Sequence, residues 1–388
     1  MDKNAKVALA LPDQQLMDTL QAVLVGEHKL NKIVRFNNVD EAYEVLSRQQ
    51  LDFIIVGIDM PDNPGVTLMQ RLREVGNYGM EPFFFLGNAV DGPTRQIFLE
   101  YDVEYVLTAP LDKNRVKNAV AQIFQRENHL PPEMQKYRDA KSAFISGVPD
   151  MARDFAEQLL QENKLTEKAS ILLGEIAFLQ EDFTAAQKHF ENVIAANPDS
   201  VAAIHKLAMI CMKQTHFNEA KALLDKIVNK NPLHLKVLEK SGLTNFELGH
   251  TDLAKEQMGR LNKMDKTNQS ATEVQTKIAI KEGNFDGIAQ RLKDSHSEKE
   301  MVSMLNNAGV MMSKKSDFTG AIKIYENCLE VVRKKEFKGK ILYNLAVAYR
   351  RLGDTGKASS CCEKCLKVYP ELDKARTMLK ELKAAAAS

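Results

Sequence analysis

Residues 167–200 read EKASILLGEIAFLQEDFTAAQKHFENVIAANPDS, and residues 201–234 and 235–268 repeat this arrangement of residue types with a period of 34. In each copy the eighth place is small, the twentieth is alanine and the twenty-fourth is large and apolar, as in Gly174, Ala186 and Phe190. Two copies carry proline at the thirty-second place, Pro198 and Pro232. A fixed period of this length indicates a protein built from one repeated supersecondary unit.

The period extends beyond these three copies. Residues 133–166 fit it loosely, 269–301 are degenerate, 302–335 and 339–372 restore it, and 373–388 are expected to form a capping helix and tail. Small residues at places eight and twenty let two antiparallel helices approach closely, and proline ends the second helix because it lacks an N–H. Such helix pairs stack into a superhelix with a concave groove. The pattern resembles the tetratricopeptide (TPR) family, with about seven units over 133–372.

The first 127 residues alternate strand-like and helix-like stretches. Five apolar runs predict buried strands, at Val7–Leu11, Ile33–Phe36, Phe53–Ile58, Phe83–Leu86 and Tyr105–Leu107. Amphipathic segments between and after them predict helices near 14–25, 39–48, 65–75, 92–101 and 113–126. Five such units predict an α/β doubly wound fold with a flavodoxin-like, five-stranded parallel sheet. Residues 128–132 are expected to link this domain to the repeats.

The stretch from Asp52 to Gly65, DFIIVGIDMPDNPG, resembles the third strand and following loop of response-regulator receiver domains. Aligning its Met60-Pro61 and Gly65 with the family places Gly57 at the phosphoacceptor position, and glycine cannot accept a phosphoryl group. The resemblance also implies that the other functional positions of the family are degenerate: Ala10 and Leu11 stand for the acidic pair that holds Mg²⁺, Gly87 for the hydroxyl residue, Ala109 for the lysine and Val106 for the switch aromatic. Because phosphoryl transfer needs metal ligands, a nucleophile and charge compensation together, we infer a pseudo-receiver.

Two aspartates near these positions have alternative interpretations. Asp59 lies on the same side of the strand as Gly57, but two residues further along, which moves it by nearly 7 Å. We therefore expect Asp59 to be a solvated loop residue rather than a phosphoacceptor. Asp13 follows the first predicted strand, and we expect it to cap the first helix.

No catalytic or cofactor-binding pattern is found in the sequence. The cluster Cys361-Cys362-Glu363-Lys364-Cys365 falls on core places of its repeat, so buried thiols are a better interpretation than a metal site. The eight histidines are scattered without paired ligand spacing, and no phosphate-binding loop or hydrolase elbow occurs. We expect no enzyme activity, no cofactor and no metal.

The groove near the C-terminus offers a polar site for a partner. Residues 302–388 hold 17 Lys and Arg against 9 Asp and Glu, a net +8 in a chain of net +1. In peptide-binding members of the TPR family, asparagine at place six binds the main chain of an extended peptide, and here that place holds Asn307 and Asn344. The same face carries basic and aromatic residues that could hold an acidic segment: Lys314, Lys340, Tyr343, Arg350 and Arg351. The alternative is that the basic residues form a solvated face and the asparagines cap local structure.

Units 167–268 instead present an apolar stripe at groove places. Its members are Ile171, Phe178, Leu179, Met209, Met212, Leu243 and Phe246. Exposed apolar patches often mark partner sites, and methionine suits adaptable surfaces. The alternative is that these side chains pack between helices.

These features predict a non-catalytic adaptor or scaffold of bacterial signalling, with protein partners bound by a phosphorylation-independent receiver and a TPR groove. The receiver-like domain is expected to dock a partner or a second copy of itself. The N-terminal apolar run is too short for a secretory segment, no stretch could span a membrane, and five cysteines without a signal peptide favour the cytoplasm. Two alternatives stay open: a phosphorylation-dependent response regulator with TPR output, and a regulator of transcription or RNA, although no nucleic-acid-binding pattern supports the second.

Overall fold

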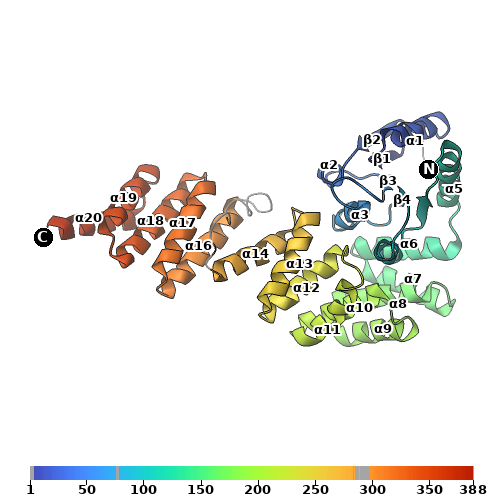
Figure 1. Ribbon diagram of the computed structural model, residues 1–388. Coiled ribbons are helices and arrows are strands. Elements are labelled where there is room, and N and C mark those ends of the chain that lie inside the picture. The colour runs from blue at the N-terminus through green and yellow to red at the C-terminus, as the bar shows by residue number, and fades with distance from the viewer. Residues whose placement is uncertain (1–3, 76–77, 283, 285–287, 289–297, 388) are drawn as a thin grey trace. The chain divides into compact units, whose positions relative to one another are not determined.

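The structure is a computed structural model that describes residues 4–75, 78–282, 284, 288 and 298–387. It consists of two compact units, Met1–Gly249 and His250–Ser388 (Figure 1). The first unit contains a five-stranded sheet with its helices and the first helices of the repeat region, and the second unit is helical. Among the described residues, none of the helices combines the length and the hydropathy needed to cross a membrane.

The sheet is entirely parallel, with strand order β2-β1-β3-β4-β5. Its strands are β1 (Lys6–Ala10), β2 (Lys32–Phe36), β3 (Phe53–Gly57), β4 (Phe83–Gly87) and β5 (Tyr105–Thr108). In this register Ala10 lies beside Val56, and Gly57 lies beside Leu86. The carboxyl ends of the strands therefore meet at one edge, which is where ligands bind in folds of this type.

Helices cover both faces of the sheet. They are α1 (Gln14–Gly26), α2 (Val39–Leu46), α3 (Gly65–Arg73), α4 (Gly92–Glu100) and α5 (Lys113–Asn128). Successive residues of β1 point to opposite faces: Val7 and Leu9 pack with α1 and α5, whereas Ala8 and Ala10 pack with α2, α3 and α4. This two-sided burial explains why the strands are continuous apolar runs.

The predicted fold class is confirmed. Each predicted strand and helix of the first 127 residues is present, with ends within two residues of those predicted. The linker is shorter than predicted: Asn128 still belongs to α5 and Pro132 already begins α6, so only residues 129–131 connect the two helices. Proline at the first helical position explains the early start of α6, because its fixed φ suits a helix and its missing N–H is not needed there.

The repeat helices of the first unit form antiparallel pairs. Their bounds are α6 (Pro132–Ile145), α7 (Pro149–Gln161), α8 (Thr166–Leu179), α9 (Phe183–Ala196), α10 (Val201–Lys213) and α11 (Phe217–Val228), followed by α12 (Leu235–Glu247). Gly174 shows why place eight is small. A Cβ at this position would lie 2.5 Å from Cε1 of Phe190, which is the apolar residue of place twenty-four.

The second unit uses the same packing device. It contains α13 (Thr251–Met264), α14 (Gln269–Lys281), α16 (Glu298–Lys314), α17 (Phe318–Val331), α18 (Lys335–Leu352), α19 (Thr355–Val368) and α20 (Asp373–Ala387). A Cβ at Gly309 would lie 2.5 Å from Cε1 of Tyr325, as at Gly174. Most of the second half of the predicted unit 269–301 lies outside the described residues.

The cysteines of the second unit are core residues. Cys328, Cys361 and Cys362 belong to its hydrophobic core, and Cys365 is fully buried and donates to the carbonyl of Gly339 at 3.1 Å. Burial raises the pKa of the Cys328 thiol to about 12 and, as the largest cause, that of Cys362 to about 11. Protonated, buried thiols pack as small hydrophobic groups, as expected from their repeat places.

Candidate functional site

Two places in the fold could carry function: the carboxyl ends of the strands, and the face formed by the first helix of each repeat. At the strand ends, the structure brings together the degenerate receiver positions. Ala10 and Leu11 are buried at the end of β1, Gly57 is buried at the end of β3, and Gly87 is half-buried at the end of β4. Ala109 is exposed after β5, and Val106 is exposed on β5.

The space beside Gly57 is occupied by apolar atoms. A Cβ at residue 57 would lie 3.0 Å from both Sδ of Met60 and Cδ of Pro12. A Cβ at Gly87 would lie 2.7 Å from Cβ of Ile58. Contacts this close leave no room for a longer side chain unless these neighbours move. The strand ends are therefore packed like a core.

The nearby aspartates have structural positions. Asp13 accepts a hydrogen bond from the backbone N–H of Leu16 at 3.0 Å, so it caps α1 as predicted. Asp62 accepts from the N–H groups of Val39 and Asp40 at 2.9 Å each, at the start of α2. Carboxylates at these positions satisfy backbone donors at helix N-termini. Asp59 is exposed in the loop after β3, as expected.

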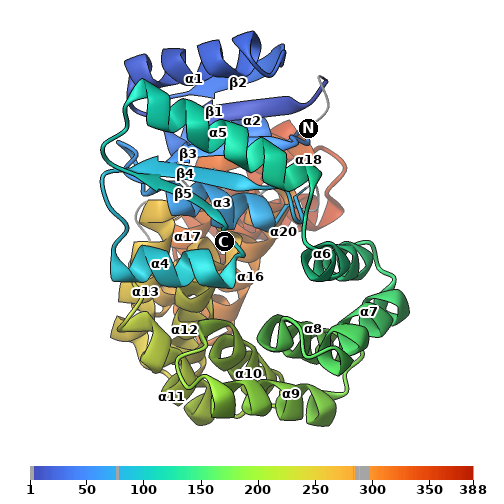
Figure 2. The ribbon, with the colours of Figure 1, turned by 90° about the vertical axis from the view of Figure 1, so that its right-hand side faces the viewer.

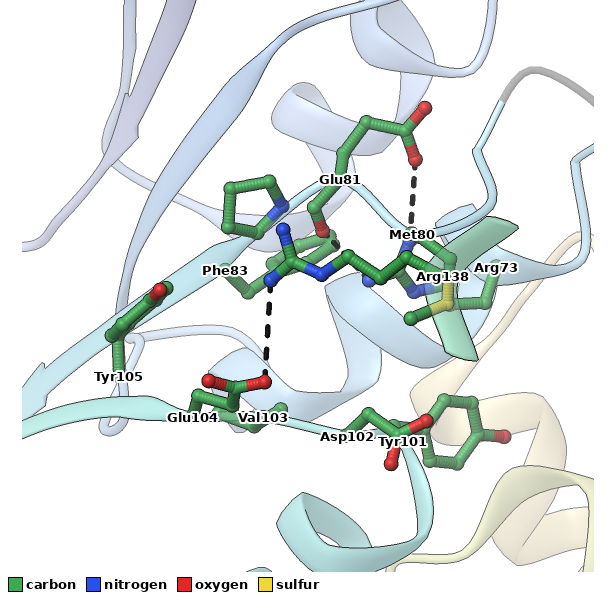
Figure 3. A pocket seen from close by; sticks show the side chains of 11 residues that line it. Arg73, Met80, Glu81, Phe83, Tyr101, Asp102, Val103, Glu104, Tyr105 and Arg138 are labelled. Atoms are coloured by element: carbon green, nitrogen blue, oxygen red, sulfur yellow. Dashed lines mark hydrogen bonds and ion pairs between the residues drawn. The ribbon is translucent and has the colours of Figure 1, made fainter. Parts of the chain in front are cut away.

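The second place is the face formed by α6, α8, α10 and α12, and the receiver-like domain lies on it (Figure 2). On α6, the hydroxyl of Tyr137 donates to Asp102 at 3.0 Å, and Arg138 makes a two-pronged ion pair with Glu127 at 2.7 and 2.9 Å. Arg138 also lies 4.0 Å from Glu104 (Figure 3). Tyr137 and Arg138 hold places five and six of the first repeat, which are groove places.

Groove places of the next repeats make similar contacts. Lys168, at place two on α8, pairs with Asp102 at 2.5 Å, and Lys236, at place two on α12, pairs with Glu74 at 2.7 Å. The receiver-like domain thus occupies the groove of the first unit through acidic side chains that meet cations. Sequence reasoning missed this docking, although the acidic residues of the domain and the basic groove places 138, 168 and 236 were a visible signal.

Neutral contacts complete the docking. The side chain of Gln70, on α3, donates to the carbonyl of Leu233 at 3.0 Å and accepts from the N–H of Leu235 at 2.9 Å. Asn231 donates to the carbonyl of Pro93 at 3.0 Å. Leu233 packs against the core of the receiver-like domain, and Met80 of that domain packs against the core of the first repeats. Gln70, buried with both amide atoms bonded, fixes the register of this contact.

A buried carboxylate and two histidines lie at the centre of the docked face. Nε2 of His234 lies 2.6 Å from Glu100, and Nδ1 of His205 lies 3.8 Å from it. Burial lowers the pKa of His205 to about 4, against the attraction of Glu100. Burial alone would raise the pKa of Glu100, but the two histidines hold it well below its usual range. The prediction that the histidines are scattered is wrong here, because the fold brings together two rings that are far apart in sequence.

A second buried carboxylate links three of the first helices. Glu175, on α8, accepts from Lys141 of α6 at 3.1 Å and from Lys206 of α10 at 2.6 Å. Burial would raise its pKa, but these two lysines lower it well below the usual range. These groups line a cavity of about 800 Å³ between α4 of the receiver-like domain and helices α6, α8 and α10.

The predicted apolar stripe does not form one surface. Ile171 lines this cavity, and Phe178 packs edge-on against Phe183, with ring centroids 5.6 Å apart. Leu179 is exposed, with 58% of its surface accessible. The others are half-buried: Met209, Met212, Leu243 and Phe246. Both interpretations of the stripe thus have members, since some of these side chains pack and others reach solvent.

The predicted polar groove lies on α16 and α18 of the second unit. Asn307, Lys314 and Arg351 are exposed, and Asn344 donates to the side chain of Asn306 at 2.6 Å. Tyr343 is half-buried against the core. Two of the predicted cations pair with acidic residues of the same unit, Lys340 with Glu336 at 2.5 Å and Arg350 with Glu381 at 2.9 Å. Such exposed pairs exchange easily with a partner's carboxylates.

The fold and these surfaces define a class of protein: a receiver-type α/β domain joined to an interaction array of helical repeats. Sequence profiles of known families agree. The response regulator receiver domain matches residues 9–121, and the tetratricopeptide repeat matches residues 177–237 and 300–371. The chain therefore carries a response regulator receiver domain followed by TPR repeats, a signalling domain joined to a protein-interaction region.

Solved structures with similar folds are distant in sequence. A tetratricopeptide repeat protein from Parabacteroides merdae shares 12% identity, covering 65% of this chain and 98% of its own, with a TM-score of 0.40. The C-terminal part of a TPR protein from Cytophaga hutchinsonii shares 16% identity, covering 63% of this chain and 99% of its own, with a TM-score of 0.45. YrrB, described as a TPR protein with an unusual peptide-binding site, shares 15% identity, covering 50% of this chain and 100% of its own, with a TM-score of 0.34.

Proposed function

We propose that the chain is a non-catalytic, cytoplasmic adaptor of bacterial signalling whose receiver domain works without phosphorylation. The receiver domain acts as a fixed part of the scaffold, seated on the groove places of the first repeats. The groove places of the last repeats bind a segment of a protein partner. The observation that carries this proposal is the packing around Gly57, because apolar atoms occupy the place where a receiver needs a carboxylate.

The loss of phosphorylation rests on both chemistry and space. Gly57 offers no nucleophile, and Ala10 and Leu11 offer no metal ligand at the end of β1. Met60 and Pro12 lie close enough to hinder even a small side chain at residue 57. Asp59 is exposed but has no acidic residue at the degenerate positions to hold Mg²⁺ beside it.

Incubation with a small phosphodonor tests this proposal directly. The full chain is exposed to acetyl phosphate with Mg²⁺ and its intact mass is measured, with a phosphorylatable receiver domain as the positive control. We expect no added phosphoryl group and no change of melting temperature with beryllofluoride. A stoichiometric mass increase that Asp59→Asn abolishes would establish the alternative of a phosphorylation-dependent regulator with TPR output.

The partner site is proposed on α16 and α18. Asn307 is placed to bond the main chain of an extended segment, and Lys314 and Arg351 are exposed on the same first helices. Lys340 and Arg350 can exchange their present acidic partners for carboxylates of the segment. The +8 charge of residues 302–388 favours an acidic partner by long-range attraction.

A crosslinking pull-down from the native cell with matched variants tests the partner site. Asn307→Ala combined with Asn344→Ala is expected to reduce capture of the partner at least tenfold, with little change in melting temperature. Asn327→Ala is the control, because Asn327 lies on the second helix α17 and bonds to Lys323 of its own helix. Equal capture by all three proteins would exclude the proposed groove.

The same preparation addresses two further predictions. Retention on nucleic acid at low salt, weakening as salt rises, would favour the regulator of transcription or RNA. A homodimer through the receiver domain predicts twice the chain mass in sedimentation equilibrium. Since α4 already faces the repeats, a dimer would have to use another surface of the domain.

A further inference from the structure

The buried cluster at the docked face has the composition of a metal site. Glu100 ends α4 of the receiver domain, His205 lies on α10, and His234 immediately precedes α12. One ligand atom from each residue can be chosen so that all three lie within 4.8 Å of one another. His205 and His234 are almost completely buried, with 1% and 0% of their surface accessible.

His205 has an unmet requirement. Both of its ring nitrogens are buried and neither has a hydrogen-bond partner. Buried polar atoms in folded proteins are almost always satisfied by protein, water or an ion. Its Nδ1 points toward Oε1 of Glu100 but stops at 3.8 Å, which is too long for a hydrogen bond. Two atoms bound to one zinc ion at about 2.0–2.1 Å each lie roughly 3.3–4 Å apart, so this distance suits a bridging metal.

We propose that Glu100, His205 and His234 form a binding site for a divalent transition-metal ion with the preferences of zinc. Two imidazoles and one carboxylate are a set that zinc accepts, with a water molecule as fourth ligand. Calcium and magnesium prefer oxygen ligands and are disfavoured by the two nitrogens. The cavity of about 800 Å³, which both Glu100 and His205 line, provides the path and the space for the water.

Metal binding needs a change at His234. In the structure its Nδ1 accepts from the N–H of Val237 at 3.3 Å, so the ring proton sits on Nε2 and is donated to Glu100. To coordinate through Nε2, the proton must move to Nδ1, and the bond from Val237 is given up. This bond is long, so its loss opposes binding only weakly.

The consequence is a staple between the domains of the first unit. Glu100 belongs to the receiver domain, whereas the histidines belong to two different TPR helices. An ion held by all three would stabilise the seated receiver domain, because the site is complete only when that domain is docked. This inference rests on the docking geometry and does not depend on the proposed partner site or on phosphorylation.

Zinc titration of the full chain, first freed of metal with a chelator and dialysed, is the test. We expect saturable binding of one zinc ion per chain by calorimetry and a rise in melting temperature of several degrees. Glu100→Gln and His205→Ala should each weaken binding at least tenfold and abolish the rise. His216→Ala is the matched control, since His216 is exposed on the same repeat and should leave both unchanged.

Cobalt substitution separates this site from the five cysteines. Cobalt bound by nitrogen and oxygen ligands gives visible absorption bands without the near-ultraviolet band of thiolate ligands. The proposal is overturned if the wild-type chain binds no metal, if the thiolate band appears, or if His205→Ala binds as tightly as wild type. Circular dichroism of each variant checks folding, and His234→Gln provides a second test of the site if His205→Ala fails to fold.

Discussion

The groove places of the first repeats and those of the last repeats are equivalent in sequence but differ in what they contact. On α6, α8 and α12, Arg138, Lys168 and Lys236 bind carboxylates of the receiver domain. On α16 and α18, Asn307 and Arg351 are exposed to solvent. A repeat pattern therefore predicts which positions line a surface, but not whether the partner is another molecule or part of the same chain.

The difference also shows how burial changes the role of charge. The ion pairs of the first groove are flanked by buried groups such as Gln70 and Glu100, so they specify one docked arrangement. The pairs of the last groove are solvated and contribute little to stability, which leaves their charges available for a partner. The same residue types thus serve structure in one region and recognition in the other.

The largest effect should be common to both regions, and it tests whether their repeats are packed alike. Gly174→Val and Gly309→Val each force a side chain against an aromatic ring, Phe190 or Tyr325, because a Cβ at either glycine would lie 2.5 Å from that ring. We expect each to lower the free energy of unfolding by about 3 kcal/mol, measured by urea denaturation. A negligible loss at either site would show that the two regions do not share this packing.

Glu100→Ala should distinguish the regions. The substitution leaves the buried N–H of His234 without an acceptor, so we expect a loss of about 2–3 kcal/mol in metal-free buffer. Glu326→Ala is the counterpart in the second unit, where an exposed carboxylate accepts from Tyr349 at 2.9 Å. It should cost clearly less. Equal losses would contradict the view that docking depends on buried polar contacts.

Gln70→Ala should have a somewhat smaller effect, of about 1–2 kcal/mol. The change leaves the carbonyl of Leu233 and the N–H of Leu235 without this partner. Hydrogen exchange should then increase at the start of α12 more than in α8. Gln187→Ala serves as control, since Gln187 bonds only to Glu191 on the exposed face of α9. If exchange at α12 is unchanged, Gln70 does not fix the docked register.

The smallest effect is expected at Arg350. Its pair with Glu381 is about half exposed on both sides, so Arg350→Ala should change the free energy of unfolding by no more than about 0.5 kcal/mol. Partner capture in low salt should nevertheless fall. A large loss of stability would mean that Arg350 is a structural residue and would remove it from the proposed partner site.

The sequence allowed the fold to be predicted almost completely, because both of its periods are simple. Alternating βα segments gave the sheet and its helices, and the repeat places explained Gly174, Gly309 and the buried cysteines. The cap at Asp13 was also predictable, since an aspartate just before an amphipathic segment satisfies the first backbone donors of the helix.

Docking could not be derived in the same way. The groove was predicted from each repeat by itself, whereas Glu100, His205 and His234 belong to three elements that only the tertiary structure brings together. Sequence spacing therefore suggested isolated histidines. The packing of Pro12 and Met60 around Gly57 was hidden for a similar reason, because the resemblance identifies which side chains are lost but not which neighbours take their space.

The position of Glu175 has a consequence for how this array keeps its curvature. One carboxylate holds a lysine from the helix before it and a lysine from the helix after it, so three successive repeats are tied at a single point. Bending the array there would separate charges that are shielded from water. The seat of the receiver domain is therefore shaped in advance, and the domain pays little entropy to settle into it.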